Sequence, residues 1–242
     1  MRAYALIPAR SGSKGLPDKN IRPVDGHPLL AYSAAFAKHI PVERVILSTD
    51  SEKYAGIGRA YGAEAPALRS AEASSDTAMG WHVLNDLAAT LPALGIPMPD
   101  IWVWLKPTCP FRDPAAVAEG IRVLAERPDI DAVRIVSETD ARMHTINAEG
   151  FLEPLLPSWD PARSKMRRSE MPKAYQPFNL EIFRHQGWVE RGPLFIGRRV
   201  HPIVLPRITG LDVDDLDSFE IIKALIEARP RPDVVARHIH LG

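Results

Sequence analysis

A loop near the amino terminus gathers basic side chains and glycines in a pattern suited to binding phosphate. It follows a short apolar run, residues 4–7, which predicts a buried strand. Gly12 and Gly15 allow the backbone to approach a ligand, so that successive N–H groups can form an anion-binding concavity. Arg10, Lys14 and Lys19 add the positive charge that a polyphosphate requires. We therefore predict a triphosphate-binding loop directly after the first strand.

This loop fits neither of the common nucleotide-binding motifs. The chain contains no Gly-x-x-x-x-Gly-Lys-Ser/Thr string, and its glycines are not spaced as Gly-x-Gly-x-x-Gly. Composition alone leaves open the alternative of a flexible surface loop with scattered charge. A second set of residues is needed to decide between the two interpretations.

Two carboxylates near the carboxyl terminus, Asp212 and Asp214, form such a set. In an extended segment residues i and i+2 share one face, so both carboxylates project together. The pair offers hard oxygen ligands suited to a Mg²⁺ ion that bridges phosphate oxygens. The alternative is a solvated acidic turn in which Asp217 or Ser218 merely caps the following helix.

Several segments resemble one family, the acylneuraminate cytidylyltransferases (CMP-sialic acid synthetases). The string from Ile7 to Ile21, Ile-Pro-Ala-Arg-Ser-Gly-Ser-Lys-Gly-Leu-Pro-Asp-Lys-Asn-Ile, is similar to that family's signature. Residues 105–112 resemble its Leu-Gln-Pro-Thr-Ser-Pro-Leu-Arg segment, and Arg69 with residues 74–77 resembles its cytosine-recognition loop. Residues 167–175 resemble an Arg-Arg-x-x-x-Pro-x-x-Tyr/Phe stretch, and the aspartate pair stands where the family has Ile-Asp-Ile-Asp before its last helix.

The resemblance implies a role for each matched position. It implies nucleotide binding by Ala9, Arg10, Ser13, Lys14, Lys19, Asn20, Arg69, Ser75 and Thr108, with Arg10, Lys19 and Asp214 acting in catalysis. It implies that Asp212 and Asp214 bind Mg²⁺ (or Mn²⁺), and that Lys106, Arg167, Arg168, Asn179 and Phe183 bind the sugar. An arginine of residues 167–168 would hold the carboxylate of the sugar, which a guanidinium can bind with two hydrogen bonds.

The chain departs from the family pattern at several of the sugar-binding positions. Lys106 replaces a glutamine that the family links to sugar contacts, and Cys109 replaces a serine. Leu180 and Phe183 replace the glycine and tyrosine of the family's Asn-Gly-Ala-Ile-Tyr. The sequence therefore leaves the sugar open, and a more anionic or non-sialic acid is among the candidates.

The family activity implied is transfer of CMP from CTP to the anomeric hydroxyl of a nonulosonic acid, with release of pyrophosphate. Three alternatives stay open. One is a cytidylyltransferase for Kdo, although that signature has an arginine where this chain has Gly15. Another is a GT-A-type glycosyltransferase with an Asp-x-Asp metal site, although that motif usually lies mid-chain. The third is a module that binds CTP without turnover.

Composition excludes some other classes of protein. The 242 residues carry 30 basic and 30 acidic side chains, which argues against a general nucleic-acid-binding protein. The single cysteine, Cys109, excludes an intrachain disulfide and suits a reducing cytosol. No signal-peptide core or long apolar run occurs. We therefore expect a cytoplasmic protein whose partners include neither nucleic acid nor membrane.

Apolar runs alternate with helical patterns through the first half of the chain. We predict strands at 4–7, 44–48, 101–105, 132–136, 178–183 and 201–205, and helices near 28–38, 51–61, 77–91, 114–126 and 218–228. Asp76 and Asp113 would cap two of these helices, and His238 and His240 would lie in a solvated tail. The alternation predicts a three-layer α/β/α Rossmann-like nucleotidyltransferase fold with a mainly parallel sheet, whose ligands lie beyond the carboxyl ends of its strands.

Residues from about 138 to 176 interrupt this alternation. They are polar, rich in proline and methionine, and contain Gly150. We expect a single domain of residues 1–242 with an inserted arm at about 138–176, built as a hairpin pair. Such an arm is too thin to bury a core of its own, so it predicts a homodimer in which a second subunit covers it.

Overall fold

The computed structural model describes residues 1–156, 167 and 170–241, with the backbone alone at positions 178 and 179. Its centre is a six-stranded sheet in the order β10-β6-β9-β5-β1-β4. These strands are β1 (Ala3–Pro8), β4 (Arg44–Ser48), β5 (Ile101–Leu105), β6 (Ala132–Thr139), β9 (Ala174–Arg184) and β10 (Val200–Val204). β1 is parallel to β4 and β5, and β6 to β10, whereas β9 runs antiparallel to β5 and β6. The predicted mainly parallel sheet is confirmed.

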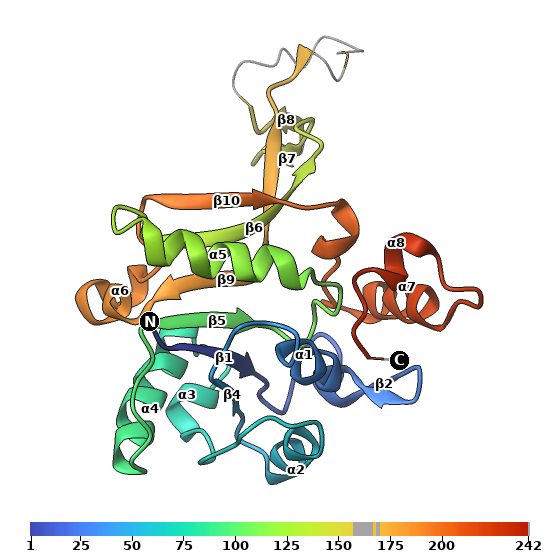
Figure 1. Cartoon of the computed structure of the whole chain (residues 1–242). Helices are drawn as coiled ribbons and strands as arrows, with labels where there is room; N and C mark the ends of the chain where they lie inside the picture. Colours follow the sequence, from blue (N-terminus) through green and yellow to red (C-terminus); the bar gives the residue numbers. More distant parts are fainter. Residues whose placement is uncertain (157–166, 168–169, 242) are drawn as a thin grey trace.

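Helices flank this sheet (Figure 1). They are α1 (Leu29–Ala37), α2 (Glu52–Ala60), α3 (Ala71–Ser74), α4 (Gly80–Ala93), α5 (Pro114–Glu126), α6 (His185–Arg191), α7 (Leu216–Glu227) and α8 (Asp233–Ala236). Within the described ranges the longest is α4, with 14 residues, and none has the length and apolar character needed to cross a bilayer, for which about 20 residues are required.

Alternate residues of β1 enter two separate hydrophobic clusters, one on each face of the sheet. Ala5 and Ile7 pack in a cluster with residues of α1, α2 and α5. Tyr4 and Leu6 pack in the other cluster, with residues of α4 and with Trp188 of α6. Because successive side chains of a strand point to opposite faces, this division shows that helices cover both. The expected three layers are therefore present.

A third cluster attaches α7 to the region after β1. It joins Phe219 and Ile222 of α7 to Leu16, Val24 and Val213. This region also contains the 3-10 helix η1 (Lys19–Ile21) and the two-stranded ribbon of β2 (Pro23–Val24) and β3 (His27–Pro28). The short 3-10 helices η3 (Gly192–Leu194) and η4 (Arg207–Gly210) lie further along the chain. Packing of α7 here brings the segment before it next to the amino-terminal loop.

Two of the predicted helix starts need correction. The helix expected from Thr77 begins at Gly80, after the short α3, and Asp76 does not cap it because its carboxylate binds Arg10 and Lys14. The helix expected at 218–228 is α7, which begins at Leu216, two residues before the expected start. Asp215 caps it by accepting a hydrogen bond from the backbone of the third helical residue. Asp113 caps α5 as predicted.

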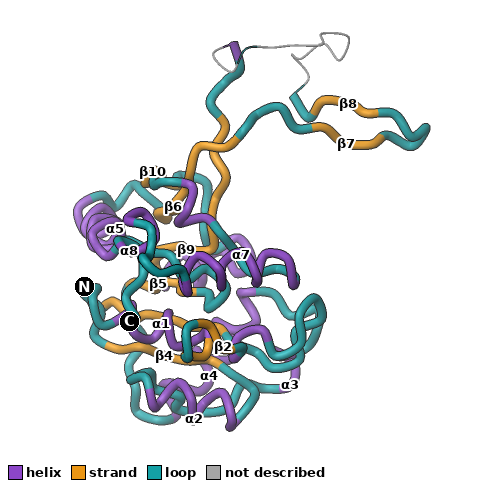
Figure 2. Tube along the Cα trace, turned by 90° about the vertical axis from the view of Figure 1, so that its right-hand side faces the viewer, coloured by secondary structure: helices purple, strands orange, loops and turns teal. Residues whose placement is uncertain are grey.

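The described part of the predicted arm is a hairpin that stands away from the sheet (Figures 1 and 2). It consists of the antiparallel strands β7 (His144–Ile146) and β8 (Leu152–Pro154). At its base β6 and β9 stay paired as far as Thr139 and Ala174. Since the chain turns back here instead of crossing over the sheet, β9 returns antiparallel to β6.

The carboxyl-terminal tail is packed against the protein, which corrects the expectation that it is solvated. His238 is only 7% exposed, and its carbonyl accepts a hydrogen bond of 3.0 Å from the backbone N–H of Arg112. A ring nitrogen of His240 lies 3.0 Å from the carbonyl oxygen of Arg112. Apolar neighbours such as Val235 and Ile239 bury the tail in the third cluster, and this burial was not evident from the flanking prolines.

Candidate active site

The loop between β1 and η1 is tied to the chain just beyond β4. Ser11 donates hydrogen bonds to Asp50 from its backbone N–H (2.7 Å) and from its hydroxyl (2.8 Å). Burial alone would raise the pKa of Asp50, but these hydrogen bonds bring it below its usual value. Gly12, with φ +69°, turns the backbone directly after this anchor. The protein's own contacts therefore hold the loop in place.

Lys19 and Gly15 bring the loop against the acidic segment that precedes α7. Lys19 Nζ donates a hydrogen bond of 2.9 Å to the carbonyl of Val213, 194 positions away in the sequence. A Cβ at Gly15 would lie 2.7 Å from the carbonyl oxygen of Asp214, so the contact requires glycine. The backbone N–H of Val213 donates to the carbonyl of Thr108 at 2.9 Å. The acidic segment is thus held from two sides.

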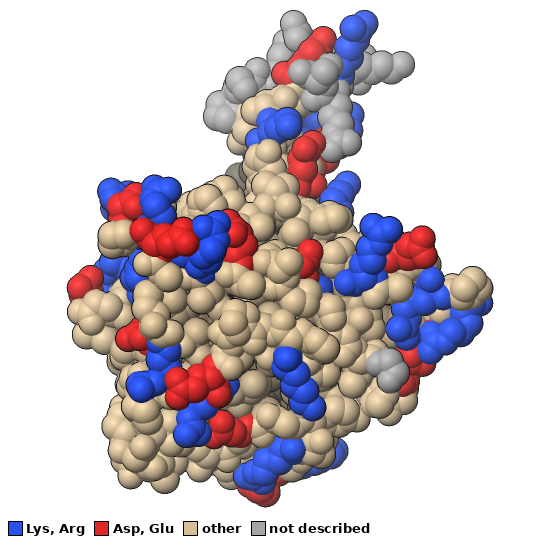
Figure 3. All heavy atoms as spheres, in the orientation of Figure 1, with Lys and Arg blue, Asp and Glu red and all other residues tan. Residues whose placement is uncertain are grey.

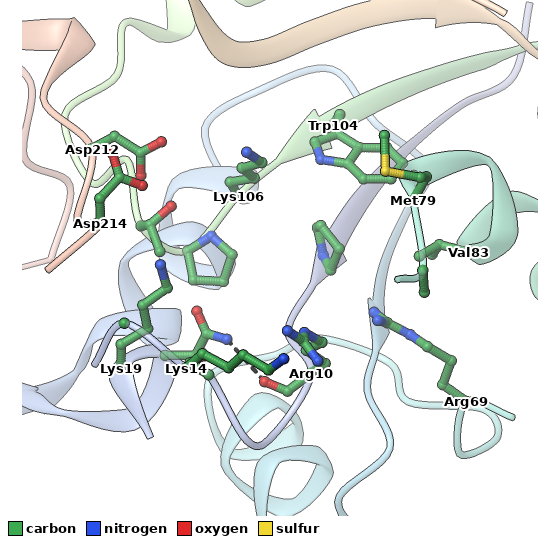
Figure 4. A pocket seen from close by; sticks show the side chains of 18 of the residues that line it. Arg10, Lys14, Lys19, Arg69, Met79, Val83, Trp104, Lys106, Asp212 and Asp214 are labelled. Carbon is green, nitrogen blue, oxygen red and sulfur yellow. Dashed lines mark hydrogen bonds between the residues drawn. The ribbon is translucent and has the colours of Figure 1, made fainter. Parts of the chain in front are cut away.

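Asp212 and Asp214 face the same cavity as the amino-terminal loop. This cavity has a volume of about 460 Å³, a size typical of small-molecule sites. It is lined by both aspartates and by the predicted residues Arg10, Ser13, Lys14, Lys19, Asn20, Arg69, Lys106 and Thr108. Figure 4 shows the two aspartates close together, with Lys19 reaching toward them from the loop. The structure therefore unites the two sets of residues that the sequence presented separately.

The carboxyl end of β5 forms another wall of the cavity. The carbonyl of Lys106 accepts hydrogen bonds from the buried side chain of Arg112 and, at 3.4 Å, from the hydroxyl of Ser33. Burial lowers the pKa of Arg112 to about 10. The side chain of Lys106 lies in the cavity between the aspartates and Trp104 (Figure 4). A ligand here would lie beyond the end of a parallel strand, as expected for this kind of fold.

The end of the cavity away from the aspartates is largely apolar. Trp104, Met79 and Val83 line it, together with Gly80 at the start of α4 (Figure 4). Arg69 also lines it but is only 8% exposed, and its guanidinium donates to the hydroxyl and carbonyl of Ser48. Burial lowers the pKa of Arg69 to about 10. The arrangement suits a flat, uncharged ring.

Asp76 contacts two of the basic residues of the loop. Its carboxylate accepts from Arg10 Nη1 at 2.9 Å and from Lys14 Nζ at 2.8 Å. Arg10 Nη1 also lies 3.4 Å from the carbonyl of Ser74. The hydrogen bonds from Lys14 and Arg10 lower the pKa of Asp76, so the carboxylate is charged at neutral pH.

Three predicted nucleotide-binding residues have other contacts within the fold. Ala9 is fully buried, and its N–H donates to the carbonyl of Ser48 at 2.9 Å. The hydroxyl of Ser75 donates to the carbonyl of Glu72 at 2.9 Å. Neither residue lines the cavity. Asn20 lines it, but its amide donates to the carbonyl of Arg10 at 3.2 Å and so fixes the loop.

The predicted sugar-binding residues are not brought together in the structure. Lys106 lines the cavity, whereas Arg167 is exposed on the arm, where its N–H donates to Glu170 at 3.3 Å. Arg168 and the side chain of Asn179 lie outside the described residues. The prediction that Phe183 binds the sugar needs correction. Its ring is fully buried on the α4 side of the sheet, and its centroid lies 4.7 Å from that of the Phe195 ring.

Some residues of the site could not be identified from the sequence. Trp104 belongs to a strand that is apolar throughout, and Met79 and Val83 carry no chemical signal. The sequence predicts Asp76 as a helix cap within the segment 74–77 and not as an ion-pair partner of the loop. Asp50, which anchors the loop, follows a strand without any motif. The one available signal was the strand rule, since Asp50 and Trp104 both lie at carboxyl ends of parallel strands.

The positive charge of the loop is a local feature. On the face drawn in Figure 3, basic and acidic side chains are interspersed, and many lie directly beside each other. This agrees with the equal numbers of basic and acidic residues in the chain. Any anion that binds is therefore attracted by the pocket residues and not by the surface as a whole.

Comparison with known proteins identifies the family. A family model described as cytidylyltransferase matches residues 4–188. The chain is 36% identical over 124 residues to the CMP-N,N'-diacetyllegionaminic acid synthase of Legionella pneumophila. This match covers 51% of this chain and 53% of that protein. It is 29% identical over 241 residues to the N-acylneuraminate cytidylyltransferase of Escherichia coli, covering 99% of this chain and 56% of that protein. The chain thus spans about half the length of these curated relatives.

A solved structure shares the fold. The CMP:2-keto-3-deoxy-manno-octonic acid synthetase complexed with CTP superimposes with a TM-score of 0.67 over 93% of this chain and 98% of that chain. At 16% sequence identity this similarity concerns the fold, and it confirms the expected Rossmann-like nucleotidyltransferase architecture. Since the family model covers more than half of the sequence, the chain belongs to the cytidylyltransferase family.

Proposed function

We propose that this protein is a CTP-dependent cytidylyltransferase that transfers CMP to the anomeric hydroxyl of a nonulosonic, sialic-like acid. The hydroxyl oxygen forms a bond to the α-phosphorus of CTP, and the bond from that phosphorus to the bridging oxygen breaks, releasing pyrophosphate. The observation that carries the proposal is the single cavity lined by both the basic loop and the Asp212–Asp214 pair. Family membership and the sialic- and legionaminic-acid relatives support it.

The two ends of the cavity bind different parts of the nucleotide. Arg10, Ser13, Lys14 and Lys19 bind the phosphates, and Arg10 and Lys19 stabilise the charge that develops as pyrophosphate leaves. Arg69 lies at the apolar end, toward the nucleoside, with the apolar wall against the base. Thr108 lies beside the acidic segment, where its carbonyl accepts from the backbone of Val213. Because no covalent enzyme intermediate is required, the protein acts through positioning and charge stabilisation.

Asp212 and Asp214 fit a Mg²⁺ ion (or Mn²⁺) that is shared with the nucleotide. Both carboxylates line the cavity beside the basic loop, and the described residues contain no cluster of three or more His, Cys, Asp or Glu side chains that could enclose a metal alone. Mg²⁺ commonly binds through one or two carboxylates together with substrate phosphates and water. When bound, it would polarise the α-phosphate and favour deprotonation of the attacking hydroxyl.

The acceptor and the oligomeric state belong to the same proposal. Lys106 lies in the cavity between its charged and apolar ends. We propose that Arg167 or Arg168 reaches the carboxylate of the acceptor from the arm of a second subunit. The described part of the arm exposes large apolar side chains, namely Met143, Ile146, Phe151, Leu152 and Leu155. Exposed apolar side chains of this size favour burial against a second subunit, and hence a homodimer. Asn179 and Ser75 stay candidate ligands for the sugar and the base, respectively.

A panel of sugar acids tests the function. The purified protein is incubated with CTP, Mg²⁺ and N-acetylneuraminate, a legionaminic acid, a pseudaminic acid or Kdo, and pyrophosphate release is measured. We expect release that depends on both CTP and one nonulosonic acid, and no release when UTP or ATP replaces CTP. Preference for Kdo would select the alternative acceptor. Release of UDP from UDP-sugars with no reaction of CTP would instead indicate a glycosyltransferase, and CTP binding without turnover a sensor.

A further inference from the structure

Asp76 occupies the two basic side chains that the proposed function assigns to phosphate. Its two carboxylate oxygens bind different partners, one Arg10 and the other Lys14, at 2.9 and 2.8 Å. Among the described residues, Arg10 and Lys14 form ion pairs with no carboxylate other than that of Asp76. A phosphate group offers the same kind of oxygen acceptor to the same cations. The carboxylate therefore binds the same two cations that the proposed function assigns to phosphate.

We propose that Asp76 sets the phosphate affinity of this site by competing with phosphate for Arg10 and Lys14. The inference rests on the proposed function, because it requires that the loop binds the phosphates of a nucleotide. When phosphate binds, Asp76 loses its two partners or stays beside a group of like charge. Either outcome lowers the affinity for CTP and for pyrophosphate. After the transfer, the return of Asp76 to the two cations favours the departure of pyrophosphate.

The location of Asp76 allows it to leave the loop without disturbing the fold. It lies in the connection between α3 and α4, residues 75–79, and its side chain is 48% exposed. The same connection contributes Ala78 and Met79 to the cavity wall. Arg10 is held independently, since its carbonyl accepts from Asn20 at 3.2 Å. The carboxylate can thus exchange for a ligand while the backbone of the basic loop stays in position.

The alternative role for Asp76 is to hold Arg10 and Lys14 ready for phosphate. A carboxylate that orients a cation without competing would raise the affinity, so its removal would weaken binding. The two roles therefore predict opposite changes for Asp76→Asn, which removes the charge and keeps the shape. Because the ion pairs are exposed, we expect this variant to fold as the wild type does.

The test is a calorimetric titration of the protein with inorganic pyrophosphate, which requires no sugar acceptor. We expect the Kd of Asp76→Asn to fall by about three- to fivefold, the factor that an exposed ion pair can contribute. In turnover assays the inhibition constant of added pyrophosphate should fall by the same factor. In the Lys14→Gln background the effect of Asp76→Asn should shrink, since one of its two partners is gone.

Glu72→Gln is the matched control. Glu72 is an exposed carboxylate on the adjacent α3 and forms no ion pair among the described residues. An equal fall in Kd for Glu72→Gln would show that net charge alone is responsible, and would overturn the proposal. An unchanged or higher Kd for Asp76→Asn, or no pyrophosphate binding by the wild type, would overturn it as well. A third outcome separates this proposal from the proposed function. If pyrophosphate binds more tightly to Asp76→Asn as expected, but the protein turns over no sugar acid, the proposed function is refuted and the role of Asp76 is not.

Discussion

The two ends of the cavity are built in different ways. The charged end joins the loop after β1 to the segment before α7, two parts of the chain that meet through Lys19, Val213, Gly15 and Asp214. The apolar end is built from β5 and α4, where Trp104 and Val83 also belong to one hydrophobic cluster. Its walls are continuous with the core around the sheet, whereas the charged end is held by the third cluster, which includes Leu16 and Val213, and by a few polar contacts.

Under the proposed function, this difference separates the phosphate and metal chemistry from the recognition of the base. Phosphate and metal chemistry requires charged groups that stay accessible, and Asp214 and Lys14 are exposed accordingly. Recognition of a flat ring requires a shaped wall, which a packed cluster provides. Changes at the charged end should therefore alter turnover and phosphate affinity strongly, and comparable changes at the apolar end should have smaller effects.

Replacement of Asp214 by asparagine gives the largest expected loss. A neutral amide is a much weaker ligand of Mg²⁺ than a carboxylate, so we expect pyrophosphate release to fall on the order of a thousandfold. Stability should change little, because Asp214 is exposed. Turnover at saturating Mg²⁺ and the thermal midpoint are the two measurements.

Asp217→Asn is the matched control for that variant. Asp217 lies in the first turn of α7, three residues further along, and is also exposed. The substitution Asp217→Asn removes the same charge, and Asp217 does not line the cavity. Wild-type turnover in Asp214→Asn, or an equal loss in Asp217→Asn, would contradict the metal assignment.

Replacement of Lys19 by methionine should give the second-largest effect. It removes a cation that the proposed function assigns to the phosphates and leaves the carbonyl of Val213 without its 2.9 Å donor. Loss of a charged hydrogen bond implies a rise in the Kd for CTP of about tenfold to a hundredfold. Lys53→Met, an exposed lysine on α2, is the control. Equal CTP affinity in the wild type and in Lys19→Met would remove this lysine from the phosphate site.

Most of the regular fold could be predicted because its local signals agree with its packing. The run 101–105 is apolar throughout, as a strand covered on both faces must be, and Asp113 followed by Pro114 marks the start of α5. The direction of β9 could not be predicted, because it depends on how the arm returns to the sheet. The tail was also misjudged, since its contacts with Arg112 connect residues more than a hundred positions apart.

The charged end of the site could be predicted better than the apolar end. Gly15, Lys19, Asp212 and Asp214 belong to segments whose residue types and spacing are typical of phosphate and metal sites. The family resemblance then favoured this interpretation over a solvated loop and turn. Phe183 shows the limit: its position matched a family motif, but only the alternation of β9 decides which face of the sheet it occupies. Asp76 shows a second limit of prediction from the sequence. An aspartate can cap a helix or form an ion pair with the loop, and the residue type alone does not distinguish the two roles.

Replacement of Gly15 by alanine tests the contact that closes the charged end. The added Cβ would lie 2.7 Å from the carbonyl oxygen of Asp214, and because this is backbone the two segments must separate. We expect a loss of about 1–3 kcal/mol in the free energy of unfolding, as overpacking typically costs. The kcat/KM for CTP should fall on the order of tenfold, as a loss of about 1.4 kcal/mol of transition-state stabilisation implies. Unaltered kcat/KM and stability would mean that the close approach is not needed.

Replacement of Gly80 by alanine places the same methyl group at the apolar end and should have the smallest effect. Its Cβ would lie 3.1 Å from Cη2 of Trp104, the outer edge of a side chain that can shift slightly. Alanine also favours the helix that begins there, by up to about 1 kcal/mol, so the two changes in the free energy of unfolding should nearly cancel. We expect the KM for CTP to stay within about twofold of the wild type, because the outer edge of the Trp104 ring needs to shift only slightly to accept the methyl group. A loss of turnover as large as that of Gly15→Ala would show that the apolar end is as sensitive as the charged one.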